Sequence, residues 1–249
     1  MQNINTLLIT GGSSGIGEAI TMKFLQNNYV VINLDIKINS TFDKMNNYKH
    51  YQLDLTNFEL LQQTLNEVQQ NYQISTIIAN AGKHLAANIE ETTIEQFHDL
   101  MRLNCEVNFY ILKSLLPSLK KHGGTIVFIG SDQTVIVKPN SSAYIASKRA
   151  AEGLILSLVA DYAKDNIRVI SLASGTVDTP LYQNAIKNYA DKSNTPLAEI
   201  KSNEAKCQPI GRIGNATEIA EMAFFVTQTS KIGYLTGARI AIDGGYTII

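Results

Sequence analysis

Tryptophan is missing from this chain of 249 residues, and cysteine and proline are scarce, with two and five residues respectively. Cys105 and Cys207 do not have the spacing of a disulfide framework, which argues against a small, disulfide-stabilised secreted protein. No stretch approaches the roughly 18 apolar residues of a membrane-spanning helix, and the N-terminus lacks the basic and apolar regions of a signal peptide. We therefore expect a soluble protein of the reducing cytoplasm, with no membrane partner.

An excess of charge of either sign is also missing. The chain has 21 Lys and Arg residues against 22 Asp and Glu residues, which gives a net charge of −1 and a pI of about 6.4. This balance argues against a polyanion-binding surface, so nucleic acid is not an expected partner. The four histidines show no metal-like clustering, and we predict no metal site.

The chain also lacks an internal repeat, a low-complexity tract and a Pro/Gly-rich linker. Its length can bury a substantial core, so we predict one domain over residues 1–249. Short β-branched runs alternate with segments of helical period, which predicts an α/β fold, a Rossmann-type, doubly wound parallel sheet of about seven strands with helices on both faces. The expected strands are Thr6–Thr10, Val30–Asp35, His50–Leu55, Thr76–Asn80, Thr125–Gly130, Arg168–Ala173 and Arg239–Asp243.

Two long helices are expected at Ile94–Lys120 and Ser142–Lys164. Both look too apolar for full exposure, and we expect them, with the C-terminal Tyr246–Ile249, to form contacts in a homo-oligomer. The segment Pro180–Gln208 is weakly periodic and follows a predicted strand, where doubly wound folds place their ligand loops. We interpret it as an irregular substrate-binding lid.

A glycine-rich turn, Thr10–Gly17, joins the first strand to a helix that begins around Glu18. Glycines allow positive φ angles and a close approach of a pyrophosphate, and the helix N-terminus offers free N–H groups. The spacing G-x-x-x-G-x-G differs from the common G-x-G-x-x-G fingerprint, and a merely tight βα connection is the alternative. The position after the first strand favours a dinucleotide site.

Asp35 closes the second strand, 18 residues beyond Gly17. A carboxylate in this place can accept hydrogen bonds from both ribose hydroxyls of NAD and repels the 2′-phosphate of NADP. Neither Ser13 nor Ser14 is basic, and Lys37 is the only cation close behind Asp35 in the sequence. The pattern predicts NAD as the cofactor, with an ordinary strand-end cap as the alternative.

Tyr144 and Lys148 are four residues apart, which places them on one face of a helix, one turn from each other. The pKa of free tyrosine is near 10, and an adjacent ammonium favours the phenolate. We therefore expect Lys148 to bring the pKa of Tyr144 well below 10. A surface pair is the alternative, because Y-x-x-x-K occurs by chance in many helices.

The motifs together resemble the short-chain dehydrogenase/reductase family from Thr10 to Gly245, in the family's order. The sequence departs from the family pattern at Ala79, Gly130 and Ser174, where the family has Asn, Ser and Pro in most or many members. The further matching motifs are Leu53–Thr56 (L-D-L-T), Asn80–Gly82 (N-A-G), Asn104, Ser131, Gly175–Pro180, Gly211–Gly214, Tyr234–Gly237 and Asp243–Gly245.

The resemblance implies a tetrameric NAD-dependent oxidoreductase with four catalytic residues, Asn104, Ser131, Tyr144 and Lys148. Tyr144 would exchange a proton with the substrate oxygen, which Ser131 orients. Lys148 would hold the nicotinamide ribose, and Asn104 would support a water relay to solvent. The cofactor contacts expected from the turn and the resemblance are Gly11, Ser13, Ser14, Gly15, Ile16, Gly17, Asp35, Asp54, Leu55, Asn80, Ala81, Gly82, Tyr144, Lys148, Val177 and Thr179.

The reaction implied is the interconversion of a secondary alcohol and a ketone. Asp132 and Gln133 follow the serine directly and would suit a polyhydroxylated substrate such as a sugar or polyol. A 3-oxoacyl-(acyl carrier protein)-type reductase is an alternative, although many such enzymes use NADPH and Asp35 argues against that. A non-catalytic NAD-binding sensor is a second alternative, which would not need to retain four catalytic side chains.

Three further residues receive ordinary interpretations. Cys105 is expected to be a small buried side chain rather than a nucleophile. Lys83 and His84 directly follow the N-A-G turn, where they could form the rim of an active site. We interpret them as part of a solvated loop.

Overall fold

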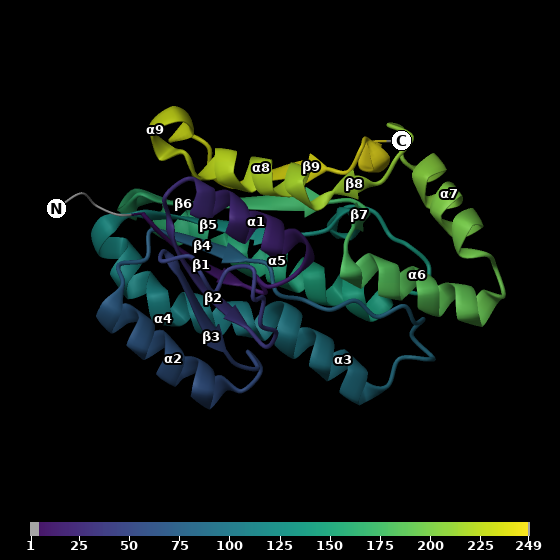
Figure 1. Ribbon diagram of the computed structural model, residues 1–249, viewed down its shortest axis with the longest axis horizontal. Helices are drawn as coiled ribbons and strands as arrows, with labels where there is room; N and C mark the ends of the chain where they lie inside the picture. Colours follow the sequence, from purple (N-terminus) through teal and green to yellow (C-terminus); the bar gives the residue numbers. More distant parts are fainter. Residues whose placement is uncertain (1–4, 249) are drawn as a thin grey trace.

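The computed structural model describes residues 5–248 and confirms the α/β fold, with one seven-stranded parallel sheet between two layers of helices (Figure 1). The strand order is β3-β2-β1-β4-β5-β6-β9, and every neighbouring pair is parallel. The strands of this sheet are β1 (Thr6–Thr10), β2 (Val30–Asp35), β3 (Tyr48–Gln52), β4 (Thr76–Ala79), β5 (Gly124–Ile129), β6 (Ile167–Ser174) and β9 (Ala238–Ile242).

The predicted strand bounds agree with these to within one residue, with the exception of β3. The prediction of His50–Leu55 was wrong at both ends, because the strand begins at Tyr48 and ends at Gln52. Just beyond it, Asp54 Oδ1 accepts hydrogen bonds from the backbone nitrogen (2.9 Å) and hydroxyl (2.7 Å) of Thr56, which turns the chain towards the next helix. A separate parallel pair, β7 (Val177–Asp178) with β8 (Gly214–Asn215), was not predicted.

The helix predicted over Ile94–Lys120 is present but is divided by one π-helical turn at Arg102–Glu106. Within residues 5–248, none of the helices combines the length and the apolar character that crossing a bilayer requires. The α-helices are α1 (Gly15–Gln26), α2 (Phe58–Asn71), α3 (Ile94–Met101), α4 (Val107–His122), α5 (Ser142–Tyr162), α6 (Pro180–Ser193), α7 (Leu197–Cys207), α8 (Ala216–Thr227) and α9 (Thr229–Ile232).

The expectation of an irregular lid over 180–208 is wrong, because this segment forms α6 and α7. Thr179 caps α6, and its hydroxyl accepts a hydrogen bond of 3.2 Å from the backbone N–H of Tyr182. Both helices are mostly polar and exposed, with Ile186 and Ile200 as their buried hydrophobic side chains, which explains the weak sequence period. Figure 1 shows the two helices together beyond one end of the sheet.

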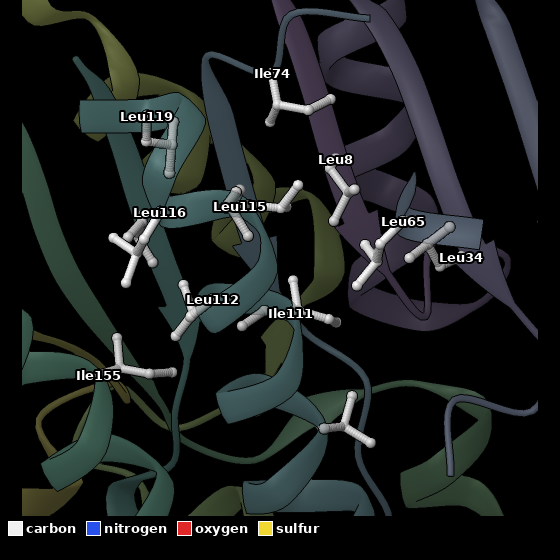
Figure 2. Close-up of a cluster of buried hydrophobic side chains, with 14 of the residues drawn as sticks. Leu8, Leu34, Leu65, Ile74, Ile111, Leu112, Leu115, Leu116, Leu119 and Ile155 are labelled. Carbon is white, nitrogen blue, oxygen red and sulfur yellow. The ribbon is translucent and has the colours of Figure 1, made fainter. Parts of the chain in front are cut away.

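Each face of the sheet has its own hydrophobic layer, because successive strand residues point to opposite faces. Leu8 and Leu34 pack with residues of α2, α4 and α5, and Figure 2 shows part of this layer. Leu7 and Ile9, which alternate with Leu8 along β1, pack with α1 and α8 on the other face. The sheet is therefore buried on both sides, as expected for parallel strands.

The strand order reverses between β1 and β4, which lie side by side in the middle of the sheet. The chain moves from β1 to β2 and β3 on one side, then crosses to β4 on the other side. Such a reversal opens a crevice at the carboxyl ends of the strands, where doubly wound folds bind their ligands. The glycine turn follows β1 and the Asn80–Gly82 turn follows β4, so both motifs lie at this crevice.

Candidate functional site

A single cleft contains most of the residues that the sequence predicted. Its walls come from the turns after β1, β2, β4, β5 and β6 and from α5, α6 and α7. Ser13 and Asn104 are the two predicted site residues that do not line it, and both are buried. The predicted residues that do line it are Gly11, Ser14, Gly15, Ile16, Gly17, Asp35, Asp54, Leu55, Asn80, Ala81, Gly82, Ser131, Tyr144, Lys148, Val177 and Thr179.

The shape of the glycine turn favours glycine at Gly15 and requires it at Gly17. Gly15 has φ +57°, in the left-handed region. A Cβ on Gly17 would lie 1.9 Å from the carbonyl oxygen of Gly11, far inside van der Waals contact. Ser14 precedes α1 in an extended conformation and makes no side-chain capping bond, so the first N–H groups of α1 remain available to an anion.

Hydrogen bonds join the glycine turn to the N-A-G turn across the crevice. The Thr10 hydroxyl accepts from the backbone nitrogens of Asn80 and Ala81, both at 3.1 Å. The Asn80 amide in turn donates to the carbonyl oxygens of Thr10 (3.1 Å) and Gly11 (2.9 Å). The side chain of Asn80 therefore braces the two turns against each other.

Asp35 is buried at the end of β2, with a carboxylate that faces the glycine turn. Its oxygens accept hydrogen bonds from the backbone nitrogens of Ser13 and Lys37, each at 2.9 Å. A carboxylate has about four lone-pair sites, so two remain for ribose hydroxyls. The Ser13 hydroxyl donates to the carbonyl oxygen of Lys37 at 2.6 Å, which makes its side chain a support for the turn.

The other predicted cofactor contacts also line the cleft. Asp54 and Leu55 line it just after β3. Val177 and Thr179 line it at the base of α6. A Cβ on Gly15 would lie 3.3 Å from the Thr179 side chain, so the glycine turn and the loop after β6 approach each other closely.

The four predicted catalytic residues come from three elements. Ser131 follows β5, Tyr144 and Lys148 lie one turn apart in α5, and Asn104 lies in the π-helical turn. A Cβ on Gly82 would lie 3.1 Å from Asn104 Oδ1 and 3.5 Å from Lys148 Nζ, which places the N-A-G turn between these side chains. The structure therefore brings Ser131, Tyr144 and Lys148 into the cleft and places Asn104 behind the N-A-G turn.

Asn104 acts on the N-A-G turn through its side chain. Its Oδ1 accepts from the backbone nitrogen of Lys83 (2.9 Å), and its Nδ2 donates to the Lys83 carbonyl (3.0 Å) and the Ser147 hydroxyl (2.9 Å). The backbone carbonyl of Asn104 accepts a bond from Asn108 Nδ2 at 2.8 Å. These bonds fix the loop after β4 to α5, one residue away from Lys148.

Burial dominates the electrostatics of the tyrosine and lysine. It raises the pKa of Tyr144 to about 12, against a smaller opposing effect of a hydrogen bond with Ser131. It lowers the pKa of Lys148 to about 8, against the attraction of Glu152. Lys148 Nζ donates to the carbonyl oxygen of Ile129 at 3.1 Å. The expectation that Lys148 brings the tyrosine pKa below 10 is therefore wrong for the protein alone.

The lowered pKa of Lys148 predicts how stability varies with pH. Between about pH 8 and 10.5 the unfolded chain binds more protons than the folded one, so stability rises with pH over this window. Relative to Lys148→Met, the wild-type protein should gain about 2 to 3 kcal/mol of unfolding free energy between pH 7 and pH 10. Urea unfolding of both proteins at several pH values would measure this. A difference in unfolding free energy between the two proteins that stays constant over this pH window would contradict the lowered pKa of Lys148.

Comparison with known families shows which family the chain belongs to. The model of the short chain dehydrogenase family matches residues 5–190. The chain belongs to this family.

Among its relatives, the oxidoreductase UcpA of Salmonella typhimurium is 30% identical, with 98% of this chain and 94% of UcpA covered. The 3-oxoacyl-[acyl-carrier-protein] reductase FabG of Thermotoga maritima is 28% identical, with 97% of each chain covered. The L-fucose dehydrogenase of Mus musculus is 28% identical, with 96% and 87% covered.

Several solved structures superpose along nearly the whole chain. A family protein from Francisella tularensis is 39% identical with a TM-score of 0.93, with 99% of this chain and 100% of the other covered. The aldohexose dehydrogenase of Thermoplasma acidophilum is 28% identical with a TM-score of 0.90, with 99% and 95% covered. ElxO, solved with NADP bound, is 25% identical with a TM-score of 0.86, with 99% and 100% covered.

Two of the residues that depart from the family pattern, Ser174 and Gly130, contact each other in this short-chain dehydrogenase. The hydroxyl of Ser174 donates to the carbonyl oxygen of Gly130 at 3.2 Å. A Cβ on Gly130 would lie 3.1 Å from Ser171 Oγ, so a serine there would be crowded. The third departure, Ala79, is buried at the end of β4 and has no polar group to satisfy. The bracing contacts come from Asn80, which is retained.

An ion pair that the sequence did not predict lies beside the predicted catalytic serine. Ser131 donates to Asp132 Oδ1 at 2.9 Å, and Lys138 Nζ lies 2.9 Å from Asp132 Oδ2. The backbone nitrogen of Gln133 donates to Ser131 Oγ at 3.2 Å. No motif marked Lys138, because it approaches Asp132 only through the fold of the loop between β5 and α5.

The interpretation of His84 as part of a solvated loop is wrong. Its ring packs edge-on against Tyr144, with 4.6 Å between ring centroids, and it lines the cleft. Burial and the positive charge of Lys138 lower the pKa of His84, so the neutral imidazole is favoured. Its position directly after the N-A-G turn was the available signal.

Proposed function

We propose that this short-chain dehydrogenase is an NAD(H)-dependent oxidoreductase that interconverts a secondary alcohol and a ketone on a small hydroxylated substrate. The observation that carries the proposal is the presence of Ser131, Tyr144 and Lys148 in the same cleft as the glycine turn and Asp35. A panel of alcohols and carbonyl compounds, followed by NADH absorbance, tests it. If the protein were a non-catalytic NAD sensor, NADH absorbance would not change with any compound of the panel.

In the proposed oxidation, the substrate hydroxyl gives its proton to the Tyr144 oxygen, and Ser131 orients the substrate oxygen. A bound nicotinamide cofactor would supply the hydride acceptor for the substrate carbon. Lys148 would hold the ribose hydroxyls beside Tyr144, and Asn104 keeps the N-A-G turn in place through its bonds to Lys83. In the reduction, the Tyr144 phenol donates its proton to the ketone oxygen, which suits a pKa raised by burial.

We further propose NAD as the preferred cofactor, because Asp35 is buried where a 2′-phosphate would approach. ElxO shows that a relative of this fold binds NADP, so the preference needs a direct test. The expected kcat/KM for NAD(H) is at least about tenfold that for NADP(H), or about 1.4 kcal/mol. Asp35→Ala should narrow this ratio, whereas Asp43→Ala serves as a control outside the cleft. Equal efficiencies in the unmodified protein would contradict the proposal.

A sugar or polyol is the proposed substrate class. Asp132 and Gln133 both line the cleft beside Ser131, as the sequence led us to expect. Two relatives act on sugars by name, L-fucose dehydrogenase and aldohexose dehydrogenase. The similarity to the FabG reductase supports the alternative of a 3-oxoacyl substrate. The free state of both cysteines agrees with the cytoplasmic location that we propose.

A homotetramer is proposed from an apolar groove between α4 and α5. Its lining residues are Phe109, Leu112, Lys113, Leu116, Pro117, Lys120, Lys121, Leu154, Leu158 and Tyr162. Phe109 is 48% exposed, which is costly for a phenyl ring in water, and a second copy of the chain would cover it.

The C-terminal residues 246–248 form a 3-10 turn with Ile248 exposed, and Ile249 lies outside the described residues.

The groove gives a prediction for the assembly. Phe109→Glu should lower the mass measured by light scattering at micromolar concentration, because it places a charge in an interface that buries an apolar ring. Lys44→Glu, on a loop away from the groove, should leave the mass unchanged. A monomeric wild-type protein at this concentration would contradict the tetramer.

A further inference from the structure

One part of the cleft contains buried polar atoms that have no hydrogen-bond partner within residues 5–248. They are Gln133 Oε1, the Tyr182 hydroxyl and both amide atoms of Gln208. Asp132 Oδ2 in the same cleft also accepts no hydrogen bond, but it forms an ion pair with Lys138 Nζ at 2.9 Å. The side chains are deeply placed, since Gln133 is 7% and Gln208 is 3% exposed. Outside the cleft, such atoms occur in the described residues only at Asp165 and Arg168. Most of the unpartnered groups among the described residues therefore line one cleft.

These three residues come from separate elements. Gln133 lies in the short turn that follows Ser131, Tyr182 lies in the first turn of α6, and Gln208 directly follows α7. Their meeting at one cleft depends on the packing of α6 and α7 over the end of the sheet, seen in Figure 1. A buried amide without a partner costs folding free energy, so native proteins rarely keep several together. A ligand that completes the missing bonds accounts for their retention.

The hydrogen-bonding capacity of the three side chains describes that ligand. Gln133 Oε1 requires a hydrogen-bond donor, and the Gln208 amide offers one donor group and one acceptor. The Tyr182 hydroxyl can donate and accept a hydrogen bond. Substrate hydroxyls both donate and accept, whereas an aliphatic acyl chain would leave every group unpaired.

The charges near these side chains argue against an anionic ligand. Glu199 and Glu204 also line the cleft, and the charge of Glu204 acts on Tyr182. Glu204 accepts a bond from the Thr176 hydroxyl at 3.2 Å. Of the lysines that line the cleft, Lys138 pairs with Asp132 at 2.9 Å and Lys83 with Asp99 at 3.1 Å, and Lys148 donates to the Ile129 carbonyl at 3.1 Å. A phosphorylated or carboxylated substrate would therefore meet carboxylates beside lysines that already have partners.

We propose that Gln133, Tyr182 and Gln208 form a hydroxyl-binding subsite that selects a neutral polyhydroxylated substrate through hydroxyls beyond the reacting carbon. The proposal rests on the proposed function, because the reacting carbon is taken to lie at Tyr144. It assigns substrate selection largely to α6 and to the residue that follows α7, Gln208. Gln208 is expected to contribute most. Its amide is the most completely buried of the three, and neither of its polar atoms has a partner.

A matched series of six-membered rings tests the subsite with NAD. The substrates are cyclohexanol, which has one hydroxyl, and the hydroxylated rings myo-inositol, D-glucose and L-fucose. We expect at least one hydroxylated ring to exceed cyclohexanol by about 100-fold in kcat/KM, because a site built to bond hydroxyls rejects analogues that lack them. Gln208→Leu should reduce this ratio at least tenfold. Equal or better turnover of cyclohexanol would overturn the subsite and leave the proposed function standing. The proposed function itself would be overturned if no alcohol gave Tyr144-dependent NADH formation and no ketone gave Tyr144-dependent NADH consumption.

Thermal unfolding separates a ligand-binding amide from a structural one. Removing an unpartnered buried amide should leave the Tm of Gln208→Leu unchanged or higher. Gln69→Leu is the matched control, because the Gln69 amide donates to the Leu65 carbonyl (3.2 Å) and Ser114 hydroxyl (3.1 Å), away from the cleft. This control should lower Tm and leave the substrate ratio unchanged. A lower Tm for Gln208→Leu with an unchanged substrate ratio would show a structural role and overturn the proposal.

Discussion

Tyr144→Phe is expected to lower kcat by several orders of magnitude while leaving the affinity for NADH nearly unchanged. The phenol oxygen is the only group that we assign to direct proton exchange with the substrate, and phenylalanine keeps the ring that packs against His84. The cofactor would be held mainly by the glycine turn, Asp35 and Lys148. Steady-state kinetics and NADH titration of the variant measure the two effects separately.

Lys148→Ala provides the contrast, because one residue is proposed to hold the ribose and to support the phenol. It should weaken cofactor binding and slow turnover together. If Tyr144→Phe keeps more than about a tenth of the wild-type rate, the lost stabilisation is about 1.4 kcal/mol or less. The proton would then travel through another group, and the assignment of Tyr144 would be wrong.

The pH dependence follows from the same phenol. Oxidation needs the deprotonated oxygen as the proton acceptor, so kcat/KM for the alcohol should rise with pH. Burial raises the pKa of Tyr144 to about 12 in the protein alone, which favours the phenol and therefore the reductive role near neutral pH. An oxidation rate that falls as pH rises from 6 to 9 would contradict this role.

With the exception of β3, the strands of the large sheet could be predicted because they are short runs that contain β-branched residues, and most of them end in a motif. The motifs at Thr10–Gly17, Asn80–Gly82 and Ser131 all follow such runs, so the parallel topology places them at one edge of the sheet. The cleft residues could be predicted for the same reason. Local sequence is enough when the function depends on where parallel strands end.

Features that depend on contacts between distant segments could not be predicted. The helices α6 and α7 bury few apolar side chains, so they leave no strong helical period in the sequence. The approach of Lys138 to Asp132, and of His84 to Tyr144, results from loop packing. The raised pKa of Tyr144 has the same origin, because the sequence shows the neighbouring lysine but not the burial that outweighs it.

Gly17→Ala is expected to abolish cofactor binding at concentrations that saturate the wild-type protein. The added Cβ would lie 1.9 Å from the backbone carbonyl oxygen of Gly11 and close to the Asn80 amide, so the turn itself must move. Moving it breaks the bond of 2.9 Å between Asn80 and Gly11, which braces the two turns. We expect at least about a 100-fold loss of NADH affinity, or about 2.8 kcal/mol, and a loss of about 3 kcal/mol in stability.

Gly153→Ala is the matched control, because a Cβ there meets no atom within 4 Å and the residue lies in α5. Alanine is favoured over glycine inside a helix, so this variant should keep the NADH affinity of the wild-type protein. Fluorescence titration with NADH and urea unfolding measure both variants. If Gly17→Ala binds NADH as tightly as Gly153→Ala, the pyrophosphate does not lie against this turn. The assignment of Thr10–Gly17 as the dinucleotide site would then be wrong, because a backbone displaced at its tightest point could not retain the same anion contacts.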